Sequence, residues 1–302
     1  MNRSNICIFV AAHRPIDWRL PEYCEKLEVN CSAQKELWDG YLHDNFGDNI
    51  SDKNYCYSEL TALYWAWKNS DAAIKGLCHY RRFFTRFTSD TMIPIFKLHR
   101  DFLADECLEA AAIRAALEGP YDIILTKPYG PYPDTAREEL EKYVYQQDIS
   151  AMEHVIREYF PEYSQCLGQV LDSRNLSYYN MFIASGKVFD DYCQWLFDVL
   201  KLVEDSVDIT QYDRQHQRLF GYLGEVLLNV YVKRQHLKCF YCKAGFLEQD
   251  FSVKNRGKVF LLRHFHRLHE FLYDHGCYPL MLKLYKIFRK PSYERLKNYE
   301  IH

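Results

Sequence analysis

Short apolar runs and longer amphipathic segments alternate along most of the chain. Residues 6–11, 74–79, 121–125 and 178–184 are compact, mostly apolar runs with the length of buried strands. Between them, apolar residues recur at intervals of three and four, which is the spacing of helices with one buried face. This alternation predicts a doubly wound α/β domain with a mainly parallel central sheet.

The segments with helical spacing are 57–69, 103–117, 138–147, 152–159, 189–203 and 221–232. Ser51 or Asn54 is placed to cap the first of them, because such side chains accept hydrogen bonds from the free N–H groups at a helix start. Residues 80–84 read as the exit from the second predicted strand. Polar residues therefore follow the strand ends, which is where open α/β sheets bind ligands.

The last fifty residues differ from the rest in charge. From Val253 to His302 there are eleven Lys or Arg and four Asp or Glu, a net charge of +7 in a chain whose total is −3. We divide the chain into a domain over residues 1–250 and a basic amphipathic helical tail over residues 251–302. Two interpretations of the tail stay open: it lies on an anionic membrane surface, or it packs on the domain with a solvated basic face.

Composition excludes several classes of protein. Hydrophobic residues make up 48% of the chain and charged residues 26%, which is typical of a folded domain and not of a disordered chain. The eleven cysteines are scattered and odd in number, which favours a reduced compartment over a disulfide framework. Cys239 and Cys242 have zinc-ligand spacing, but no second pair completes the set. No apolar run reaches about 18 residues, so we expect a cytoplasmic protein that neither spans a membrane nor is exported.

Several blocks of the sequence are similar to one family, the domain of unknown function found in bacterial capsular, exopolysaccharide and lipopolysaccharide glycosyltransferases. The resemblance spans residues 6 to about 232. It rests on Gly47–Ser51, Lys53–Asn54, Glu59–Trp65, Trp67–Asn69, Gly76–Arg82, Tyr179–Ile183, Trp195–Phe197 and Arg218–Tyr222 with Glu225. It implies a GT-A-like fold of a single Rossmann-type domain, followed here by the helical tail. It also implies a hexosyltransferase, and some members are described as galactofuranosyltransferases.

The resemblance implies a nucleotide-sugar donor, most simply a UDP-sugar, and a glycan or lipid-linked oligosaccharide acceptor. Nucleic acid is not an expected partner. Two rival classes are kept. A nucleotidyl- or phosphotransferase lacks support because neither a Gly-x-x-x-x-Gly-Lys-[Ser/Thr] loop nor a Gly-x-Gly-x-x-Gly turn is present. The other is a non-catalytic polysaccharide-assembly protein whose tail binds the inner face of the cytoplasmic membrane or an anionic partner.

Glycosyl transfer from such a donor needs positive charge, because the departing diphosphate gains negative charge as the glycosidic bond breaks. Many GT-A enzymes supply it through an Asp-x-Asp motif and a divalent metal. The corresponding strand exit here reads His79, Tyr80, Arg81 and Arg82. Two guanidiniums match phosphate oxygens and are always charged. We therefore expect a metal-independent enzyme with Arg81 and Arg82 as catalytic residues.

Two alternatives to that interpretation stay open. In the first, one arginine pairs with a buried carboxylate such as Asp122 while the other is solvated. A divalent Mn²⁺ or Mg²⁺ ion bound by Asp48 is also conceivable, although we do not favour it.

Further donor contacts are predicted at the second strand exit, where His79 and Tyr80 are the candidates, around the first strand end and in the turn-rich loop. His13 and Arg14 follow the strand at 6–11, and Arg218 precedes the last helix of the domain. The loop offers carboxylates, amides, a hydroxyl and an amine to a ribose, a uracil or sugar hydroxyls: Asp44, Asp48, Asn49, Ser51, Lys53 and Asn54. Composition alone reads the same loop as a turn followed by an ordinary helix cap, with Lys53 solvated.

Inverting transfer, which we expect, needs a general base that takes the proton of the acceptor hydroxyl. Glu225, which we place early in a helix, is the candidate; a carboxylate there also simply favours the helix dipole. Asp172, Asp148 and Asp213 are reserves, and a retaining enzyme would need no such base. Tyr179 and Asn180 are predicted to contact the acceptor.

Overall fold

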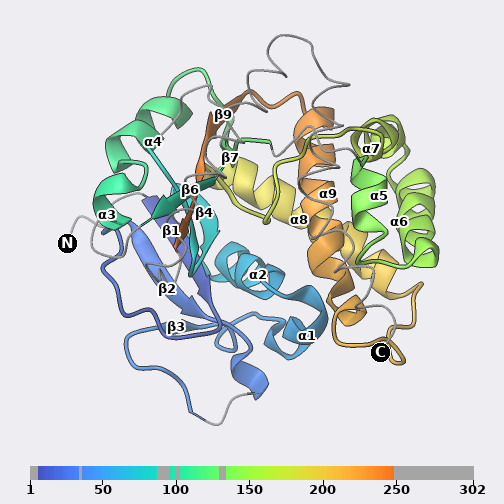
Figure 1. Ribbon diagram of the computed structural model, residues 1–302, viewed down its shortest axis with the longest axis horizontal. Coiled ribbons are helices and arrows are strands. Elements are labelled where there is room, and N and C mark those ends of the chain that lie inside the picture. Colours follow the sequence, from blue (N-terminus) through green and yellow to red (C-terminus); the bar gives the residue numbers. More distant parts are fainter. Residues whose placement is uncertain (1–5, 34–35, 87–94, 99–102, 129–133, 248–302) are drawn as a thin grey trace, which may run out of the picture. The chain divides into compact units, whose positions relative to one another are not determined.

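The computed structural model describes residues 6–33, 36–86, 95–98, 103–128 and 134–247 (Figure 1). All of them lie in one of the two compact units into which the chain divides, the one formed by Met1–Thr88 and Pro94–Glu248. The predicted tail over residues 251–302 lies outside the described residues. Its helical character and its boundary at residue 250 therefore stay predictions.

The main sheet runs in the order β3-β2-β1-β4-β8-β7-β9. Its strands are β1 (Ile6–Ala12), β2 (Cys24–Glu28), β3 (Leu42–His43), β4 (Ile74–His79), β7 (Ile123–Thr126), β8 (Phe182–Ser185) and β9 (Cys239–Cys242). Only β8 runs against its neighbours, so the other six strands point their carboxyl ends to one edge. The predicted mainly parallel sheet is confirmed.

A short branch leaves the sheet where β4 ends. Residue His79 of β4 pairs with Arg82 of β5 (Arg82–Phe84), which pairs in turn with β10 (Ala244–Leu247) and through it with β6 (Ile95–Leu98). The predicted strand exit thus turns back on itself within two residues. This tight reversal sends the side chains of consecutive residues in different directions, which matters for the arginines.

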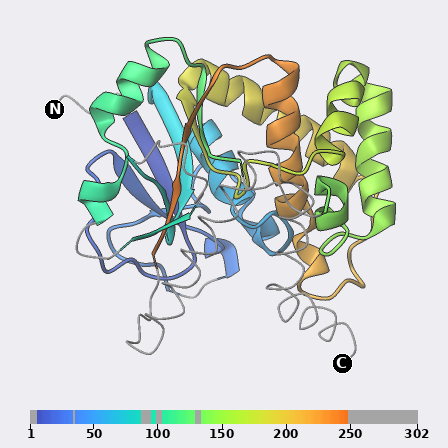
Figure 2. The same ribbon diagram turned by 45° about the horizontal axis from the view of Figure 1, so that its top comes forward.

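Strand β1 shows why the sheet is covered on both faces. Ile8 and Val10 belong to one hydrophobic cluster, while Phe9 and Ala11 belong to the other, because successive side chains of a strand point to opposite faces. Helix α4 (Ala110–Leu117) covers the first face. Helices α2 (Leu60–Asn69) and α8 (Gly186–Glu204) cover the second (Figures 1 and 2). The layered α/β fold expected from the alternating pattern is confirmed.

A second group of helices packs beyond α8. It consists of α5 (Ala136–Leu140), α6 (Gln146–Tyr159), α7 (Ser164–Leu171) and α9 (Leu219–Arg234). Helix α9 is buried along most of its length and contacts α7, α8 and the short helix α1 (Asn54–Tyr57) (Figure 2). It therefore joins the sheet side of the domain to the outer helices.

Several predicted elements differ in extent. The helices expected over 138–147 and 152–159 are observed as α5 (Ala136–Leu140) and α6 (Gln146–Tyr159). The helix expected over 57–69 is broken at Ser58, whose φ of 51° no α-helix contains. The helix expected over 103–117 divides into α3 (Leu103–Glu106) and α4. The strand expected over 178–184 begins only at Phe182, because Tyr179 and Asn180 have φ values of 78° and 52°. Side chains rarely tolerate this left-handed backbone, so these breaks indicate local constraint.

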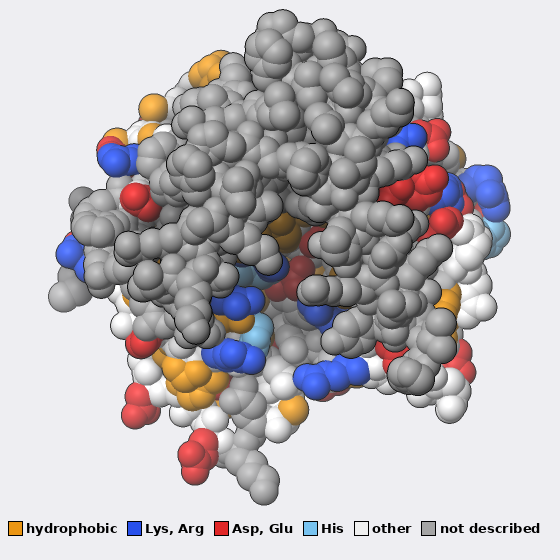
Figure 3. Space-filling model, viewed as in Figure 1, with side chains coloured by type: hydrophobic (Ala, Val, Ile, Leu, Met, Phe, Trp, Pro, Cys, Tyr) orange, Lys and Arg blue, Asp and Glu red, His pale blue; other side chains and the backbone are white. Residues whose placement is uncertain are grey.

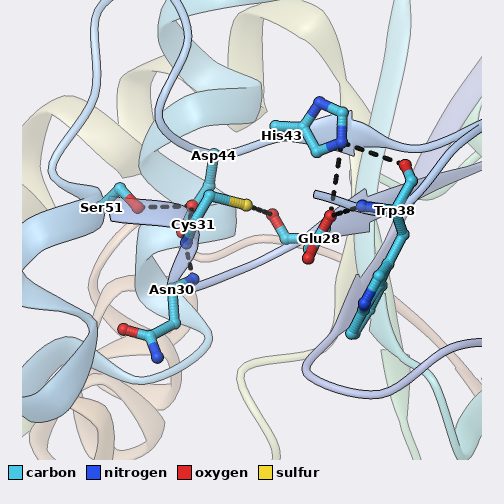
Figure 4. A network of polar contacts seen from close by, with 7 residues as sticks. All are labelled: Glu28, Asn30, Cys31, Trp38, His43, Asp44 and Ser51. Atoms are coloured by element: carbon cyan, nitrogen blue, oxygen red, sulfur yellow. Dashed lines mark hydrogen bonds and ion pairs between the residues drawn. The ribbon is translucent and has the colours of Figure 1, made fainter. Parts of the chain in front are cut away.

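The turn-rich loop before α1 is organised around a buried carboxylate. Asp44 is fully buried, and its two oxygens accept hydrogen bonds from the backbone N–H groups of Asn30 and Cys31 and from the hydroxyls of Ser51 and Thr61, at 2.5–3.0 Å (Figure 4). Charged acceptors make stronger hydrogen bonds than neutral ones. The loop is thus tied to β2 and to α2 at one point.

Asp44→Ala should lower the free energy of unfolding by about 3 kcal/mol, because it leaves four buried donors without their charged acceptor. Urea unfolding followed by circular dichroism measures this. The exposed Asp52→Ala is the matched control in the same loop and should change stability little. Equal stability of the two variants would contradict the role given to Asp44.

Candidate active site

A cavity of about 370 Å³ opens at the carboxyl-terminal edge of the sheet, between the start of β8 and helices α5 and α9. Its polar lining comes from carboxylates, guanidiniums and phenols, and the complete lining is Glu59, Arg82, Ala136, Glu139, Leu140, Tyr143, Leu176, Tyr178, Tyr179, Arg218, Tyr222, Glu225 and Val226. Figure 3 shows basic and histidine side chains gathered beside a hollow with acidic side chains inside it.

Arg82 enters the cavity from the first position of β5. Its guanidinium carbon lies 4.4 Å from the ring centre of Tyr179 and 5.1 Å from that of Phe246. Two aromatic faces hold the cation in place through their negative quadrupoles. Among the residues that the structure describes, no carboxylate forms an ion pair with the Arg82 guanidinium, which suits it to an anionic ligand.

Arg81 points elsewhere because of the reversal between β4 and β5. It is exposed, does not line the cavity, and lies over the ring of Tyr80 at 5.2 Å. Asp122, the alternative partner for one of these arginines, accepts a hydrogen bond from the backbone N–H of Lys238 at 2.7 Å. The structure therefore separates the two arginines that the sequence groups together.

The second guanidinium of the cavity belongs to Arg218, at the start of α9. Its Nε donates a hydrogen bond to the Ser58 hydroxyl at 3.1 Å, and its guanidinium carbon lies 5.5 Å from the ring centre of Tyr222. Arg218 was predicted as a donor contact. It joins Arg82 in one cavity although 136 residues separate them in sequence.

Glu225 projects into the same cavity from the second turn of α9. We expected Glu225 early in its helix, but it lies beyond the first turn of α9. The helix dipole therefore does not account for a carboxylate at this position. Its Oε1 accepts a hydrogen bond from the Tyr179 backbone N–H at 3.0 Å. Removal from water and the nearby charge of Glu59 raise the pKa of Glu225 to about 8, although Arg82 and Arg218 oppose this.

Glu59 is the functional candidate that sequence reasoning missed. It follows the break at Ser58 and lines the cavity, where its Oε1 accepts a hydrogen bond from the Asn180 amide at 2.7 Å. The only sequence signal is its place in the block Glu59–Trp65, where a carboxylate reads as an ordinary first-turn residue. Three carboxylates, those of Glu59, Glu139 and Glu225, and two guanidiniums therefore share the cavity.

Asn180 does not face the cavity as an acceptor contact. It is 1% exposed, and its amide donates both to Glu59 and to the backbone oxygen of Gly221 at 3.0 Å. A Cβ at Gly224 would lie 2.9 Å from the Asn180 side-chain oxygen, so α9 can approach only because that position is glycine. Asn180 therefore positions Glu59 and α9. The prediction that it contacts the acceptor is corrected, because its side chain is buried.

Tyr179 is held from both sides of its left-handed backbone. Its N–H binds Glu225, and its carbonyl oxygen accepts a hydrogen bond from His79 Nε2 at 2.6 Å. Burial lowers the pKa of His79, so the ring is neutral and carries its proton on Nε2. The ring of Tyr179 lines the cavity, as the predicted acceptor contact requires.

Positive charge also gathers at the end of β1. Partial burial, and then the charges of Arg14, Arg81, Arg218 and Arg82 in that order, lower the pKa of His13. The His13 ring packs edge-to-face against Tyr80 at 4.6 Å. His13, one of the predicted donor contacts, thus lies in the field of the arginines and beside Tyr80, and the predicted Arg14 is exposed.

The predicted donor contacts of the turn-rich loop do not line the cavity. Asp44 and Ser51 are fully buried and bond to each other. Lys53 pairs with Glu204 at 2.8 Å, and the Asn54 amide donates to the Ser58 carbonyl oxygen and the Thr61 hydroxyl. Asp48 accepts from the Tyr64 hydroxyl, and the Asn49 amide donates to the Gly47 carbonyl oxygen. Of these loop residues, Asn54 contacts the break at Ser58 that precedes Glu59.

Among the residues that the structure describes, no three His, Cys, Asp or Glu side chains are arranged to hold a metal ion. Cys239 and Cys242 carry free thiols in β9. Within the same described part of the chain, no helix has the length and apolar character needed to cross a membrane.

The raised pKa of Glu225 makes the protein less stable as pH rises. Between about pH 4.5 and 8 the folded protein keeps a proton that the unfolded chain has lost, so stability falls by up to about 1.4 kcal/mol per pH unit. Glu225→Gln should remove this slope. Urea unfolding at pH 5, 7 and 9 should show that the free energy of unfolding of Glu225→Gln increases relative to that of the wild type as pH rises. The exposed Glu118→Gln should show no such relative increase. Parallel curves for Glu225→Gln and the wild type would contradict the assignment.

Comparison with solved structures finds the same architecture in a protein described as the WbbM bifunctional glycosyltransferase, in its apo form. The TM-score is 0.72 and the sequence identity 27%, over 81% of this chain and 45% of that one. The chain therefore spans less than half the length of that protein. The comparison of this chain with curated proteins finds no significant match.

The family model described as "Domain of unknown function (DUF4422)" matches residues 7–236. This span nearly coincides with the range from 6 to about 232 over which the sequence blocks show their resemblance. More than two thirds of the chain is covered, and the matched residues include Arg82, Arg218, Glu59 and Glu225. The chain belongs to the DUF4422 family.

Proposed function

We propose that this protein is a glycosyltransferase that moves a sugar from a nucleotide-diphosphate donor to a hydroxyl of a surface-polysaccharide intermediate. The carrying observation is that Arg82, Arg218 and Glu225 meet in one cavity at the carboxyl-terminal edge of the sheet. The donor class we favour is a UDP-sugar, with UDP-galactofuranose the first to test. The acceptor class is a glycan or a lipid-linked oligosaccharide, and the transfer is inverting. The likeness to a bifunctional glycosyltransferase supports this proposal.

The two cavity guanidiniums are suited to the departing diphosphate. Arg82 is held against the two rings of Tyr179 and Phe246, and Arg218 is held by the Ser58 hydroxyl, so both are oriented before a ligand arrives. Preorganised donors stabilise developing charge without the cost of reorientation. Arg81, Arg14 and His13 lie outside this pair, and we assign them to the nucleotide end of the donor. In this arrangement the charge that a metal supplies elsewhere comes from Arg82 and Arg218.

Glu225 is suited to be the general base. Transfer requires it to take a proton from the acceptor hydroxyl, and its surroundings favour the protonated carboxyl. The Tyr179 N–H fixes one of its oxygens, which leaves the other for the acceptor. Tyr143, Tyr178 and Tyr222 form the aromatic walls through which a sugar ring would approach.

We place the protein in the cytoplasm, with the tail over residues 251–302 at the inner face of the cytoplasmic membrane. The support is the net charge of +7 from Val253 to His302, which anionic lipid headgroups attract. Such a location would bring the cavity to lipid-linked acceptors.

Glu225→Gln should lower transfer 10²- to 10⁴-fold, the range expected when a general base is lost. Transfer is measured as UDP released from a panel of UDP-sugars with and without oligosaccharide acceptors. In the wild type, kcat/KM should rise with pH toward about 8, as Glu225 ionises. UDP should still raise the melting temperature of the variant, which controls for an intact donor site. Activity of Glu225→Gln within a few-fold of the wild type would refute the assignment.

Arg82→Ala should lower kcat by 10²- to 10³-fold, because a preorganised donor to the developing charge is lost. Arg82→Lys should recover only part of this, since an ammonium has neither the fork nor the stacking of a guanidinium. Wild-type activity should be unchanged in EDTA. Loss of activity in EDTA with recovery on adding Mn²⁺ would overturn metal independence, whatever the arginine variants show.

A further inference from the structure

Three rings form a cluster on the surface next to the cavity. Tyr145 stacks on His216 with ring centres 4.2 Å apart and planes at 6°, and Tyr212 meets Tyr145 edge-on at 4.8 Å. Tyr145 remains 41% exposed. We call these three residues the outer aromatic platform. Partly exposed aromatic rings of this kind offer a ligand an apolar face with polar groups at its edge.

The platform is rigid although it lies at the surface. The Tyr212 hydroxyl donates to Asp148 Oδ1 at 3.0 Å and accepts from the Gln147 amide at 2.6 Å. The His216 ring nitrogen Nδ1 bonds to Asp213 Oδ2 at 2.6 Å. Rings that are fixed before binding lose little conformational entropy when a ligand arrives.

The platform continues the aromatic wall of the cavity outward. Tyr143, two residues before Tyr145, lines the cavity and stacks on Tyr222 with ring centres 5.1 Å apart. Likewise Arg218, two residues after His216, lines the cavity. Two separate segments therefore each supply one inner residue and one outer residue, so the inner and outer surfaces are adjacent.

The chemistry of the platform fits a neutral sugar chain. A sugar ring presents C–H groups on its faces, which pack on aromatic rings, and hydroxyls at its rim, which hydrogen-bond to side chains. Exposed Gln147 and Asp213 border the rings and offer such partners.

We propose that Tyr145, Tyr212 and His216 form an outer subsite that binds a preceding sugar unit of the acceptor chain, while the unit being extended occupies the cavity. This inference rests on the proposed glycosyltransferase function. It assigns the protein an acceptor of several sugar units, since a single sugar would not reach both surfaces. Longer acceptors should therefore bind better than short ones.

The first test measures acceptor KM against chain length, with oligosaccharides of one to six units of whichever neutral sugar serves as acceptor. In the wild type, KM should fall about tenfold once the chain is long enough to reach the platform. Tyr145→Ala should abolish that gain, and Tyr145→Phe should keep it because the ring remains. Tyr159→Ala is the matched control, since Tyr159 is 62% exposed and ends helix α6, whose N-cap is Tyr145.

The second test measures binding without turnover, so that it holds even if the protein transfers no sugar. Saturation-transfer NMR with neutral hexasaccharides of glucose, galactose and mannose should show contact for at least one of them. Tyr145→Ala should lose that contact and Tyr159→Ala should keep it. Contact with none of the three, or equal contact in Tyr145→Ala, overturns the subsite. Transfer that proceeds with the same chain-length dependence in Tyr145→Ala refutes the subsite while leaving the proposed function intact.

Discussion

Two consecutive left-handed residues connect the sheet to the catalytic candidates. The Tyr179 N–H holds Glu225, and the Asn180 amide holds Glu59, so one strained dipeptide fixes two of the carboxylates that line the cavity. Such backbone costs of order 1–3 kcal/mol per residue and persists only when its surroundings determine it. Two contacts hold this backbone in place. The neutral His79 ring donates to the Tyr179 carbonyl oxygen, and α9 approaches Asn180 closely at Gly224.

The turn-rich loop contributes indirectly to the position of the same dipeptide, through the contacts of Asp44 and Asn54. Asp44 anchors Thr61, and Asn54 donates to both Thr61 and the Ser58 carbonyl oxygen, which fixes the break between α1 and α2. That break turns Glu59 toward Asn180 and sets the Ser58 hydroxyl against Arg218. Residues far from the cavity thereby decide where its charges lie.

The sequence predicts the fold well and the site only in part. Strand β4 is evident from its apolar run, and Arg82, Arg218 and Glu225 can be selected because cations and a carboxylate suit the expected chemistry. Glu59 resembles any carboxylate in a first helical turn, since the break at Ser58 depends on contacts from distant segments. The loop over residues 44–54 was assigned to the donor because polar residues that bind ligands and polar residues that bind each other have the same composition.

The charge balance of the cavity gives the proposed reaction its direction. During transfer the acceptor hydroxyl loses its proton to Glu225, its oxygen bonds to the sugar, and the diphosphate leaves with one more negative charge. The total charge is unchanged, but it moves from a carboxylate that burial and Glu59 disfavour to a group beside Arg82 and Arg218. The features that raise the pKa of Glu225 thus make it a stronger base, and the arginines stabilise the charge that appears as it is neutralised. A single buried carboxylate without the arginines would only retain its proton, and the arginines without it would bind the donor but leave the acceptor hydroxyl unactivated.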